Sequence, residues 1–281
     1  MIIFDYYQPD ERVRDLIGSY YATTVPEPLE DVMRAEIANV RFILEGKLHS
    51  DMSGEMRSFV PGDAILCGPT FRWSTIRFER GTRLVGAAIT PLGWARMFGV
   101  PAEEHADNWV ALKDVAPAKV HGLIDRILDP ASDGTRVALA DVMFAALDNP
   151  DAKVNHDFLD IVTDWLTDPE PNELEDLLAA IDLSPRQVER LSKLYFGCAP
   201  KKLHRKFRAL HSANRLSWDA LEDWREAATT AYYDQSHFIR EFKEFNGRTP
   251  SEFIKGAHLL VRQTLNERRQ IEHHSPYSLV G

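Results

Sequence analysis

Two stretches of the chain, 50 residues apart, carry polar and basic side chains at matching positions. Residues 184–200 read SPRQVERLSKLYFGCAP and residues 234–250 read DQSHFIREFKEFNGRTP, so Arg190 matches Arg240. The polar side chains of the two copies are Arg186, Gln187, Arg190 and Lys193, and then Gln235, Ser236, His237 and Arg240. Guanidinium and amide groups can donate to base edges, and basic groups can bind phosphates. The doubled pattern therefore indicates hydrogen-bonding chemistry toward a polyanion.

The elements that would position these side chains are two short capped helices. Apolar residues recur at helical spacing in both copies, at Val188, Leu191 and Tyr195 and then at Phe238, Phe242 and Phe245. Each copy begins with a capping residue, Ser184 or Asp234, and stops at a glycine, Gly197 or Gly247. Gln187 completes a capping box with Ser184. Since another helix precedes each copy, the pattern predicts two helix-turn-helix units.

Length and composition allow two domains of ordinary size, because the 281 residues include 44% apolar residues. Cys67 and Cys198 lie far from any Cys or His pair at metal spacing and fit a reducing compartment. No apolar run approaches the ~20 residues of a membrane span, and the N-terminus lacks a basic region followed by an apolar one. We therefore expect a cytoplasmic protein with no metal, no cofactor and no membrane partner.

The charge is unevenly distributed along the chain. The net charge of −10, taken alone, argues against a polyanion partner. Residues 184–215, however, contain nine basic side chains and one acid, Glu189. This local excess predicts a basic patch, and the alternative is a solvated helical face.

The N-terminal half predicts a small antiparallel sheet or barrel with flanking helices, which makes the fold class α+β. Residues 10–21 have amphipathic spacing and predict a first helix. Short alternating or β-branched runs predict strands at residues 39–44, 57–60, 64–67, 73–78 and 83–89. Further helices are expected at residues 91–100, after Pro101, at 115–128 and at 136–147. The break at residues 148–151 predicts a domain boundary there, with the first domain over residues 1–150.

The C-terminal half predicts an all-α domain over residues 151–265. Asn155 can cap a helix over residues 156–167, and a two-turn helix over residues 173–180 leads into the first copy. A long helix from Pro200 to about Leu216 would span roughly 24 Å. Such a helix would space the two units for successive major grooves, which lie about 34 Å apart.

Three further segments complete the expected C-terminal half. Residues 224–231 are expected to form the support helix of the second copy, and residues 249–256 to close the domain. The tail over residues 266–281 is expected to be poorly ordered.

Two stretches resemble a known family. SPRQVERLSKLYFGCAPKKLHRKFRAL and AYYDQSHFIREFKEFNGRTPSEF resemble the DNA-binding domain of the AraC/XylS family of bacterial transcription regulators, over residues 155–256. The second stretch, residues 231–253, is the family's most specific motif. Residues 1–150, with YYQPDERVRDLIGSYY and ITPLGWARMFGVPAEEHADNWVAL, resemble an uncharacterised sensor-like domain that often precedes it.

The resemblance implies that two recognition helices, about residues 184–196 and 234–246, enter adjacent major grooves. It assigns base reading to Arg186, Glu189, Arg190, Gln235, Ser236, Ile239 and Arg240. Arginine can bind O6 and N7 of guanine, and glutamine can pair with adenine. Glu189 either accepts from cytosine N4 or is a surface bystander. Contacts to phosphates are assigned to Gln187, Lys193, Lys201, Lys202, Arg205 and His237.

The sequence departs from the family pattern at two turns. Ala231 and Asp182 stand where the family usually has glycine. If these positions need a positive φ, aspartate is tolerable and alanine costs on the order of 1 kcal/mol.

Aromatic residues of the N-terminal half offer a possible ligand site. Phe71, Trp73 and Trp94 are candidates for lining an effector cavity, and the alternative is that they fill the core. An enzyme is disfavoured, since a metal-dependent barrel needs two or three histidines and the β region offers only His49. No nucleophile motif or phosphate loop stands out.

These observations predict a sequence-specific transcription regulator that binds double-stranded DNA. Its N-terminal domain is expected to bind a small-molecule effector or to form a homodimer, and RNA polymerase is a further expected partner. The alternative is a protein-interaction module that has lost DNA binding. The effector, the operator, and the choice between activator and repressor stay open.

Overall fold

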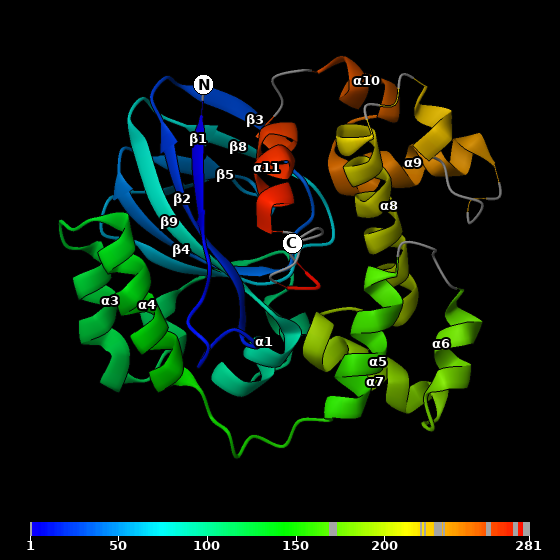
Figure 1. Ribbon diagram of the computed structural model, residues 1–281, viewed down its shortest axis with the longest axis horizontal. Helices are drawn as coiled ribbons and strands as arrows, with labels where there is room; N and C mark the ends of the chain where they lie inside the picture. Colours follow the sequence, from blue (N-terminus) through cyan, green and yellow to red (C-terminus); the bar gives the residue numbers. More distant parts are fainter. Residues whose placement is uncertain are drawn as a thin grey trace.

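The protein combines two antiparallel sheets with a helical C-terminal half (Figure 1). The computed structural model describes residues 2–168, 173–219, 221, 223–227, 232, 234–256, 260–271 and 275–277. The predicted fold class is confirmed: antiparallel sheets with flanking helices come first, and helices follow.

All strand pairs in both sheets are antiparallel. The six-stranded sheet has the order β1 (Ile3–Tyr7), β2 (Ile17–Val25), β9 (Thr82–Ile89), β4 (Ala38–Glu45), β7 (Ala64–Cys67), β10 (Trp109–Ala111). The four-stranded sheet has the order β3 (Leu29–Met33), β8 (Ser74–Phe78), β5 (Leu48–Ser50), β6 (Arg57–Phe59). The five predicted strands are present. The sequence patterns did not predict β1, β2, β3, β5 and β10.

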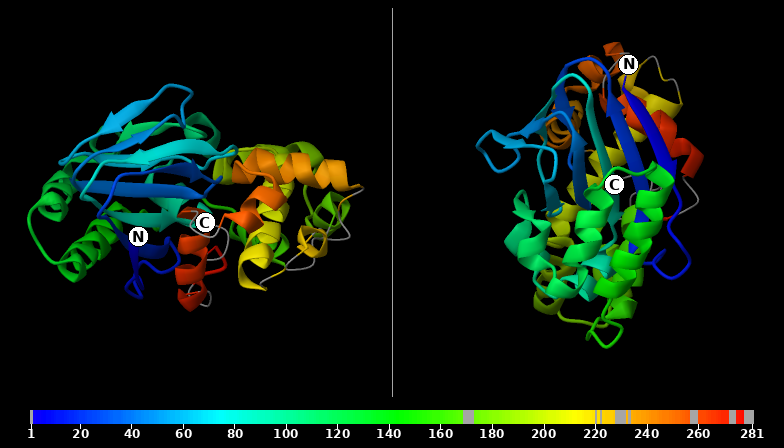
Figure 2. Two further views of the ribbon diagram at one scale, coloured as in Figure 1. Left: turned by 90° about the horizontal axis from the view of Figure 1, so that it is seen from above. Right: turned by 90° about the vertical axis from the view of Figure 1, so that its left-hand side faces the viewer.

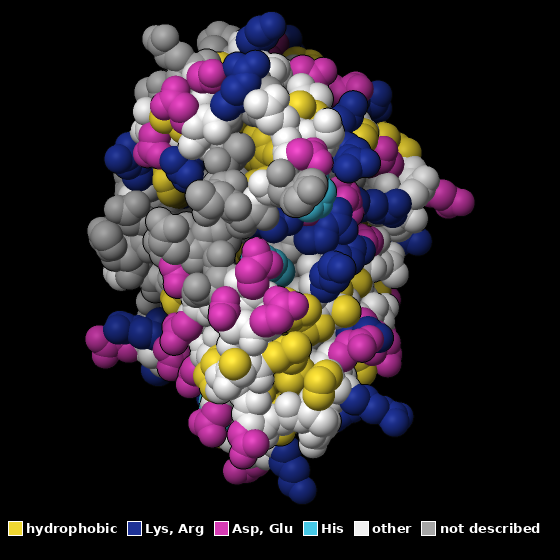
Figure 3. Space-filling view, turned by 90° about the vertical axis from the view of Figure 1, so that its right-hand side faces the viewer, with side chains coloured by type: hydrophobic (Ala, Val, Ile, Leu, Met, Phe, Trp, Pro, Cys, Tyr) yellow, Lys and Arg dark blue, Asp and Glu magenta, His cyan; other side chains and the backbone are white. Residues whose placement is uncertain are grey.

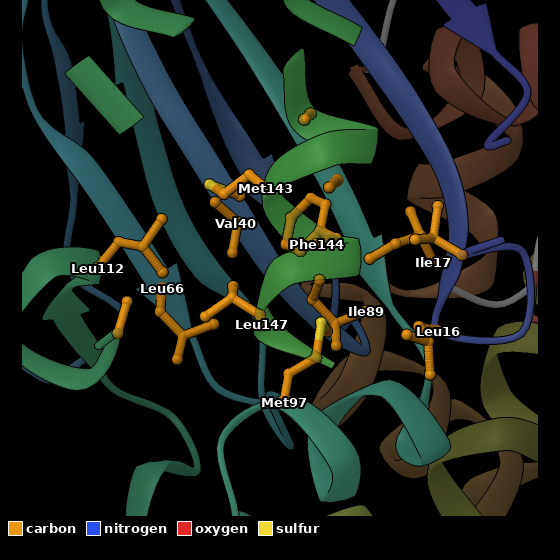
Figure 4. Close-up of a cluster of buried hydrophobic side chains, with 14 of the residues drawn as sticks. Leu16, Ile17, Val40, Leu66, Ile89, Met97, Leu112, Met143, Phe144 and Leu147 are labelled. Atoms are coloured by element: carbon orange, nitrogen blue, oxygen red, sulfur yellow. The ribbon is translucent and has the colours of Figure 1, made fainter. Parts of the chain in front are cut away.

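Alternation along β4 sends its side chains into two different cores. Val40 and Phe42 face the helices outside the larger sheet, where Phe144 and Leu147 pack in the same cluster (Figure 4). Ile43 points the other way, into the apolar core between the two sheets. Arg41 points to this inner side as well, so the inner core contains a buried charge.

The prediction of a helix over residues 10–21 is wrong. Residues 17–25 form β2, which pairs with β1 and β9 and is buried on both faces. Tyr21 lies opposite Gly86 of β9, where a Cβ would come within 2.2 Å of the tyrosine ring. A strand with both faces buried loses the alternating pattern, so its apolar residues also satisfied a helical spacing.

The helices outside the larger sheet follow the predictions with one break. They are α1 (Pro91–Met97), η1 (Ala102–His105), α2 (Leu112–Val115), η2 (Ala118–Val120), α3 (His121–Leu128) and α4 (Asp133–Leu147). The predicted helix at 115–128 is divided because Pro117 has no N–H and disfavours a continuous helix.

The C-terminal half contains the predicted succession of helices up to residue 255, whereas the helical segments over residues 260–271 were not predicted. The helices of this half are α5 (His156–Thr167), α6 (Leu174–Ala180), α7 (Pro185–Phe196), α8 (Pro200–Trp218), η3 (Trp224–Ala227), α9 (Gln235–Asn246), α10 (Pro250–Lys255), α11 (Leu260–Arg268) and η4 (Arg269–Ile271). Within the described residues, none of these helices is long and apolar enough to cross a membrane. Ala231 and the end of the predicted support helix lie outside the described residues. Asp182 does not adopt a positive φ.

The chain after α10 returns to the N-terminal sheets. Helix α11 lies between the sheets and α8 in Figure 1, and Figure 2 shows it beside the sheets from a second direction. Leu260 joins the core between the sheets, and its N–H donates to Asp31 Oδ2 at 2.7 Å. Further along, Tyr277 is buried and bonds the Thr163 hydroxyl at 2.6 Å. Residues 266–271 and 275–277, which were expected to be poorly ordered, thus include helical and buried positions.

Candidate nucleic-acid interface

The doubled stretch forms α7 and α9, and their predicted caps are present. Ser184 Oγ accepts from the N–H of Gln187, whose side chain accepts from the N–H of Ser184 at 2.9 Å. Asp234 Oδ1 accepts from the N–H of His237 at 2.8 Å. The two helices end at Gly197 and Gly247, with φ of 87° and 78°, a left-handed conformation that favours glycine.

Both helices bury the apolar faces that the spacing predicted. Val188, Leu191 and Tyr195 of α7 pack with α5, α6 and α8. The cluster under α9 includes Phe238, Phe242 and Phe253. Burial of these faces fixes which side of each helix is left for a partner.

Most of the residues assigned to base reading lie on the exposed sides. Arg186, Glu189 and Arg190 of α7 are exposed, and so are Gln235, Ser236 and Arg240 of α9. Ile239 is the exception, because it is half-buried against the phenylalanine cluster. Glu189 pairs with Lys193 at 2.9 Å along α7, and this hydrogen bond raises the pKa of Lys193.

Three arginines on these faces keep their guanidinium groups available. Arg186, Arg190 and Arg240 form no ion pair with any residue that the structure describes. Arg240 makes a single hydrogen bond at its Nε, to the Ser236 carbonyl at 3.3 Å on its own helix. These three side chains can therefore meet an external acceptor without breaking an ion pair.

Arg205, one of the residues assigned to phosphate contacts, has two ion-pair partners within the protein. Arg205 Nε donates to Glu241 at 2.8 Å, and its second ion pair is with Glu244. These contacts point the Arg205 guanidinium at α9, so a contact with phosphate would require Arg205 to exchange them. No sequence pattern linked these residues, which are 36 and 39 positions apart.

The other residues assigned to phosphate contacts differ in availability. Lys201 and Lys202 are exposed near the start of α8, although the Lys202 ammonium lies 5.0 Å from the centre of the Phe71 ring. Gln187 is exposed but occupied in the capping box. His237 is half-buried, with its ring 3.5 Å from Glu241. Lys201 is thus the residue of this set that is most available to bind a phosphate.

The predicted basic patch over residues 184–215 is smaller than the sequence indicated. Lys206 and Arg208 are 1% and 7% exposed, so two of the nine basic side chains do not contribute to the surface. Figure 3 shows Lys and Arg side chains gathered on this side of the molecule with Asp and Glu side chains beside them. The basic patch is therefore smaller than predicted, since the long helix α8 buries part of its basic side.

Helix α8 joins the two units. Its 19 residues span about 28 Å. In Figure 1 it runs down the helical half of the molecule, with α9 beside its upper part and α7 beside its lower part. This length is somewhat less than the ~34 Å between successive major grooves on one side of a DNA duplex.

The N-terminal domain contacts the C-terminal ends of both recognition helices. Gly197 packs against Pro69 and Phe71, and Gly247 packs against Val32 and Trp73. Recognition helices usually contact bases through their N-terminal residues. These contacts therefore leave the base-reading halves of α7 and α9 uncovered.

The aromatic residues assigned to an effector cavity do not share one. Trp94 fills the core outside the larger sheet, Phe71 is buried at the junction of the two halves, and Trp73 is 38% exposed. The cavity between the sheets is lined instead by side chains that include Arg34, Arg41 and Arg268. Arg41 was not among the predicted site residues, although a charge within the apolar run of β4 is a signal in the sequence.

Replacing Ser184 with alanine is expected to lower the free energy of unfolding by about 1 kcal/mol, because α7 loses its side-chain cap. Urea unfolding followed by circular dichroism measures the change. Ser251→Ala is the matched control, since Ser251 is exposed in the first turn of α10 but Thr249 caps that helix. Equal effects of the two substitutions would contradict the cap's contribution.

Comparisons with known proteins point to the same segment. A helix-turn-helix domain family matches residues 177–256. The HTH-type transcriptional regulator GbdR of Pseudomonas aeruginosa is 27% identical over 90 residues, which are 32% of this chain and 24% of GbdR. The chain thus matches about a quarter of that relative's length.

A likeness in fold extends further along the chain. A 1.65 Å structure of ToxT from Vibrio cholerae superimposes with a TM-score of 0.50 and 10% identity, over 90% of this chain and 98% of ToxT. At this identity the likeness concerns the fold alone. The family match covers both recognition helices.

Proposed function

We propose that this chain, whose residues 177–256 are an AraC-type helix-turn-helix domain, is a sequence-specific DNA-binding transcription regulator. The observation that carries the proposal is the pair of capped helices α7 and α9. Each presents exposed arginine at the matching position, Arg190 or Arg240, with no ion pair to a described residue. Guanidinium groups on a recognition helix bind the O6 and N7 acceptors of guanine.

Adjacent major grooves are the proposed target of the two units. Arg186, Glu189 and Arg190 would read bases in one groove, and Gln235, Ser236, Ile239 and Arg240 in the next. Lys201 and Lys202 would bind phosphate, joined by Gln187, Lys193, Arg205 and His237 once their internal partners are exchanged. The length of α8, about 28 Å, supports simultaneous contact with both grooves.

The N-terminal domain completes the proposal as a sensor of a small-molecule effector or as a dimerisation surface. RNA polymerase is the partner through which such a regulator would act, and a cytoplasmic location is part of the proposal. The relative named above is a transcriptional regulator, which supports a non-enzymatic role. Among the described residues, no group of three or more His, Cys, Asp or Glu is placed to hold a metal ion.

Selection of bound sequences from a random duplex pool tests the proposal with the full-length protein. We expect an enriched site with two sequence elements about one helical turn apart, one for each recognition helix. Enrichment of a single element would contradict the two-groove arrangement. No enrichment, and no binding at low salt, would favour the protein-interaction module.

Replacing Lys201 with alanine is expected to weaken binding about equally on specific and random DNA. Because each phosphate contact releases condensed counterions, the salt slope should become shallower by about 0.9. Fluorescence anisotropy across a salt series measures both quantities. Lys119→Ala removes an exposed lysine from the N-terminal domain and serves as control. An unchanged slope would remove Lys201 from the phosphate-binding set.

A further inference from the structure

The loop between β7 and β8 contacts the ends of both recognition helices. Pro69 and Phe71 of this loop pack against Gly197 at the end of α7. Trp73, two residues further along, packs against Gly247 at the end of α9. The two glycines occupy matching positions of the doubled stretch. One short loop of the N-terminal domain therefore contacts the same point of each helix-turn-helix unit.

Glycine at these two points permits a very close approach. A Cβ on Gly197 would come within 2.7 Å of Pro69 Cγ. A Cβ on Gly247 would come within 2.9 Å of Val32 Cγ2 and within 3.1 Å of the Trp73 ring. Because there is no room for a side chain, the backbone at the end of each helix lies directly against the N-terminal domain.

Hydrogen bonds on two sides fix the β7–β8 loop. On one side, the Thr70 N–H donates to the Glu36 carbonyl at 3.0 Å, and the Glu36 N–H donates to Thr70 Oγ1 at 2.7 Å. On the other side, the Phe71 N–H donates to Asp107 Oδ1 at 2.7 Å, and the Asp107 N–H donates to the Pro69 carbonyl at 3.1 Å. Asp107 has a φ of 53°, a left-handed conformation that is uncommon outside glycine. Partners from two other segments thus hold the loop in one conformation.

The same loop contacts α8, the helix that joins the two units. The Phe71 ring centre lies 5.0 Å from the Lys202 ammonium and 4.9 Å from the Lys206 ammonium. Ammonium groups within about 6 Å of a ring centre are attracted to the face of the ring. Lys206 is buried and also donates to the Glu36 carbonyl at 2.6 Å. The N-terminal half of α8 is therefore held against the same loop as α7 and α9.

Helix α8 by itself leaves the distance between the two units adjustable. It is the covalent link between them, and its 19 residues form one helix. Helices of this length can curve, and a bend in α8 would change both the distance and the angle between α7 and α9. A fixed loop that contacts the ends of both recognition helices opposes such a bend.

We infer that Phe71 and Trp73 fix the distance between the two recognition helices, and thereby the spacing of the two DNA sequence elements that the protein accepts. The spacing rests on the proposed function, whereas the distance between the helices does not. One inserted base pair moves the second element by about 3.4 Å and turns it by about 35° around the duplex. Two recognition helices held at one distance cannot both follow that change.

Binding to a series of duplexes tests the effect on spacing, with the selected site and with one or two base pairs inserted between its two elements. For the unmodified full-length protein, we expect one inserted base pair to weaken binding by about tenfold or more, because the second unit can no longer bind together with the first. Trp73→Ala is expected to reduce this loss to about threefold, since the freed units can adjust to the new spacing. Trp73 is 38% exposed, so this substitution leaves the core intact.

Met56→Ala is the matched control for the spacing measurement. Met56 is 56% exposed directly before β6, so its replacement also removes an exposed apolar side chain from a loop of the N-terminal domain. We expect this variant to keep the full loss on insertion. An equal loss in Trp73→Ala and in the unmodified protein would overturn the inference.

A distance measurement on the free protein tests the inference without DNA. Arg190→Cys and Arg240→Cys together place two nitroxide labels at matching exposed positions of α7 and α9, and the two native cysteines are buried. Pulsed electron paramagnetic resonance gives the distribution of distances between the labels. We expect Trp73→Ala to broaden this distribution and the control to leave it unchanged. A distribution of unchanged width in Trp73→Ala would overturn the inference.

Phe71→Leu tests the other contact of the loop. Phe71 is 3% exposed, and leucine keeps an apolar side chain there while it removes the ring that faces Lys202 and Lys206. We expect a smaller broadening than in Trp73→Ala, because Pro69 still contacts Gly197. No broadening would overturn the role of Phe71.

Failure of this inference and failure of the proposed function are distinguishable. A distance distribution that broadens in Trp73→Ala, together with no binding to any duplex, would overturn the proposed function and keep the effect of the loop on the helices. Binding to the selected site with the same spacing tolerance in all variants would keep the regulator and overturn the inference.

Discussion

Replacing Glu241 with alanine is expected to lower the free energy of unfolding by about 3–5 kcal/mol. Glu241 lies on the recognition helix α9, but its side chain is fully buried. It accepts from Arg205 Nε at 2.8 Å and from Arg208 Nη2 at 2.8 Å, and both arginines belong to α8. Without this carboxylate, the buried Arg208 loses a charged partner inside the protein, which is costly in a medium of low polarity.

Glu244→Ala is the matched control for this prediction. Glu244 also pairs with Arg205, but its side chain is 39% exposed, so its loss should cost no more than about 1 kcal/mol. Urea unfolding of both variants measures the difference. A cost of Glu241→Ala within 1 kcal/mol of the control would show that α9 is held to α8 by apolar packing alone.

Replacing Arg240 with alanine is expected to weaken binding to the selected DNA site by about 1–3 kcal/mol, roughly 5- to 150-fold, and to relax selectivity at one base pair. Arg240 is exposed on α9, and no described carboxylate competes for its guanidinium. The full interaction with a guanine is therefore available on binding. The effect should be much smaller on random duplexes, where this base contact is seldom formed.

Binding of Arg240→Ala to the selected site and to random duplex is measured at one salt concentration. Arg126→Ala is the control, because it removes an exposed arginine from α3, in the N-terminal domain. We expect the control to leave both affinities unchanged within about twofold. An equal loss on both duplexes would show that Arg240 contacts only phosphate.

Helices α7 and α9 could be predicted from the sequence because every signal that defines them is local. Ser184 and Asp234 cap the first turns, and the apolar residues recur at helical spacing. Each helix ends at a glycine that has the left-handed conformation. All of these interactions join residues within a few positions of one another. The exposure of Arg190 and Arg240 followed, since a helix that buries one face must present the other.

Strands were less predictable where both faces are buried. The apolar run that contains Ile17 and Tyr20 fits the spacing of a helix as well as that of a buried strand. It forms a strand because β2 pairs with β1 and β9. This choice depends on partners up to 72 residues away, Ile17 opposite Ile89, which no local pattern reveals. The docked tail was missed for the same reason: Tyr277 is buried only because Thr163 and its neighbours are there.

The sequence by itself determined the two capped helices, their outward arginines and the order of sheet before helices. The tertiary structure alone decided which charges stay available. Arg205 and Arg240 are the same residue type in the same half of the chain, yet one is bound by Glu241 and Glu244 while the other faces solvent. The tertiary structure also placed Arg34, Arg41 and Arg268 around one cavity. The physical reason is that helix formation depends on neighbours along the chain, whereas the environment of a charge depends on every segment that folds against it.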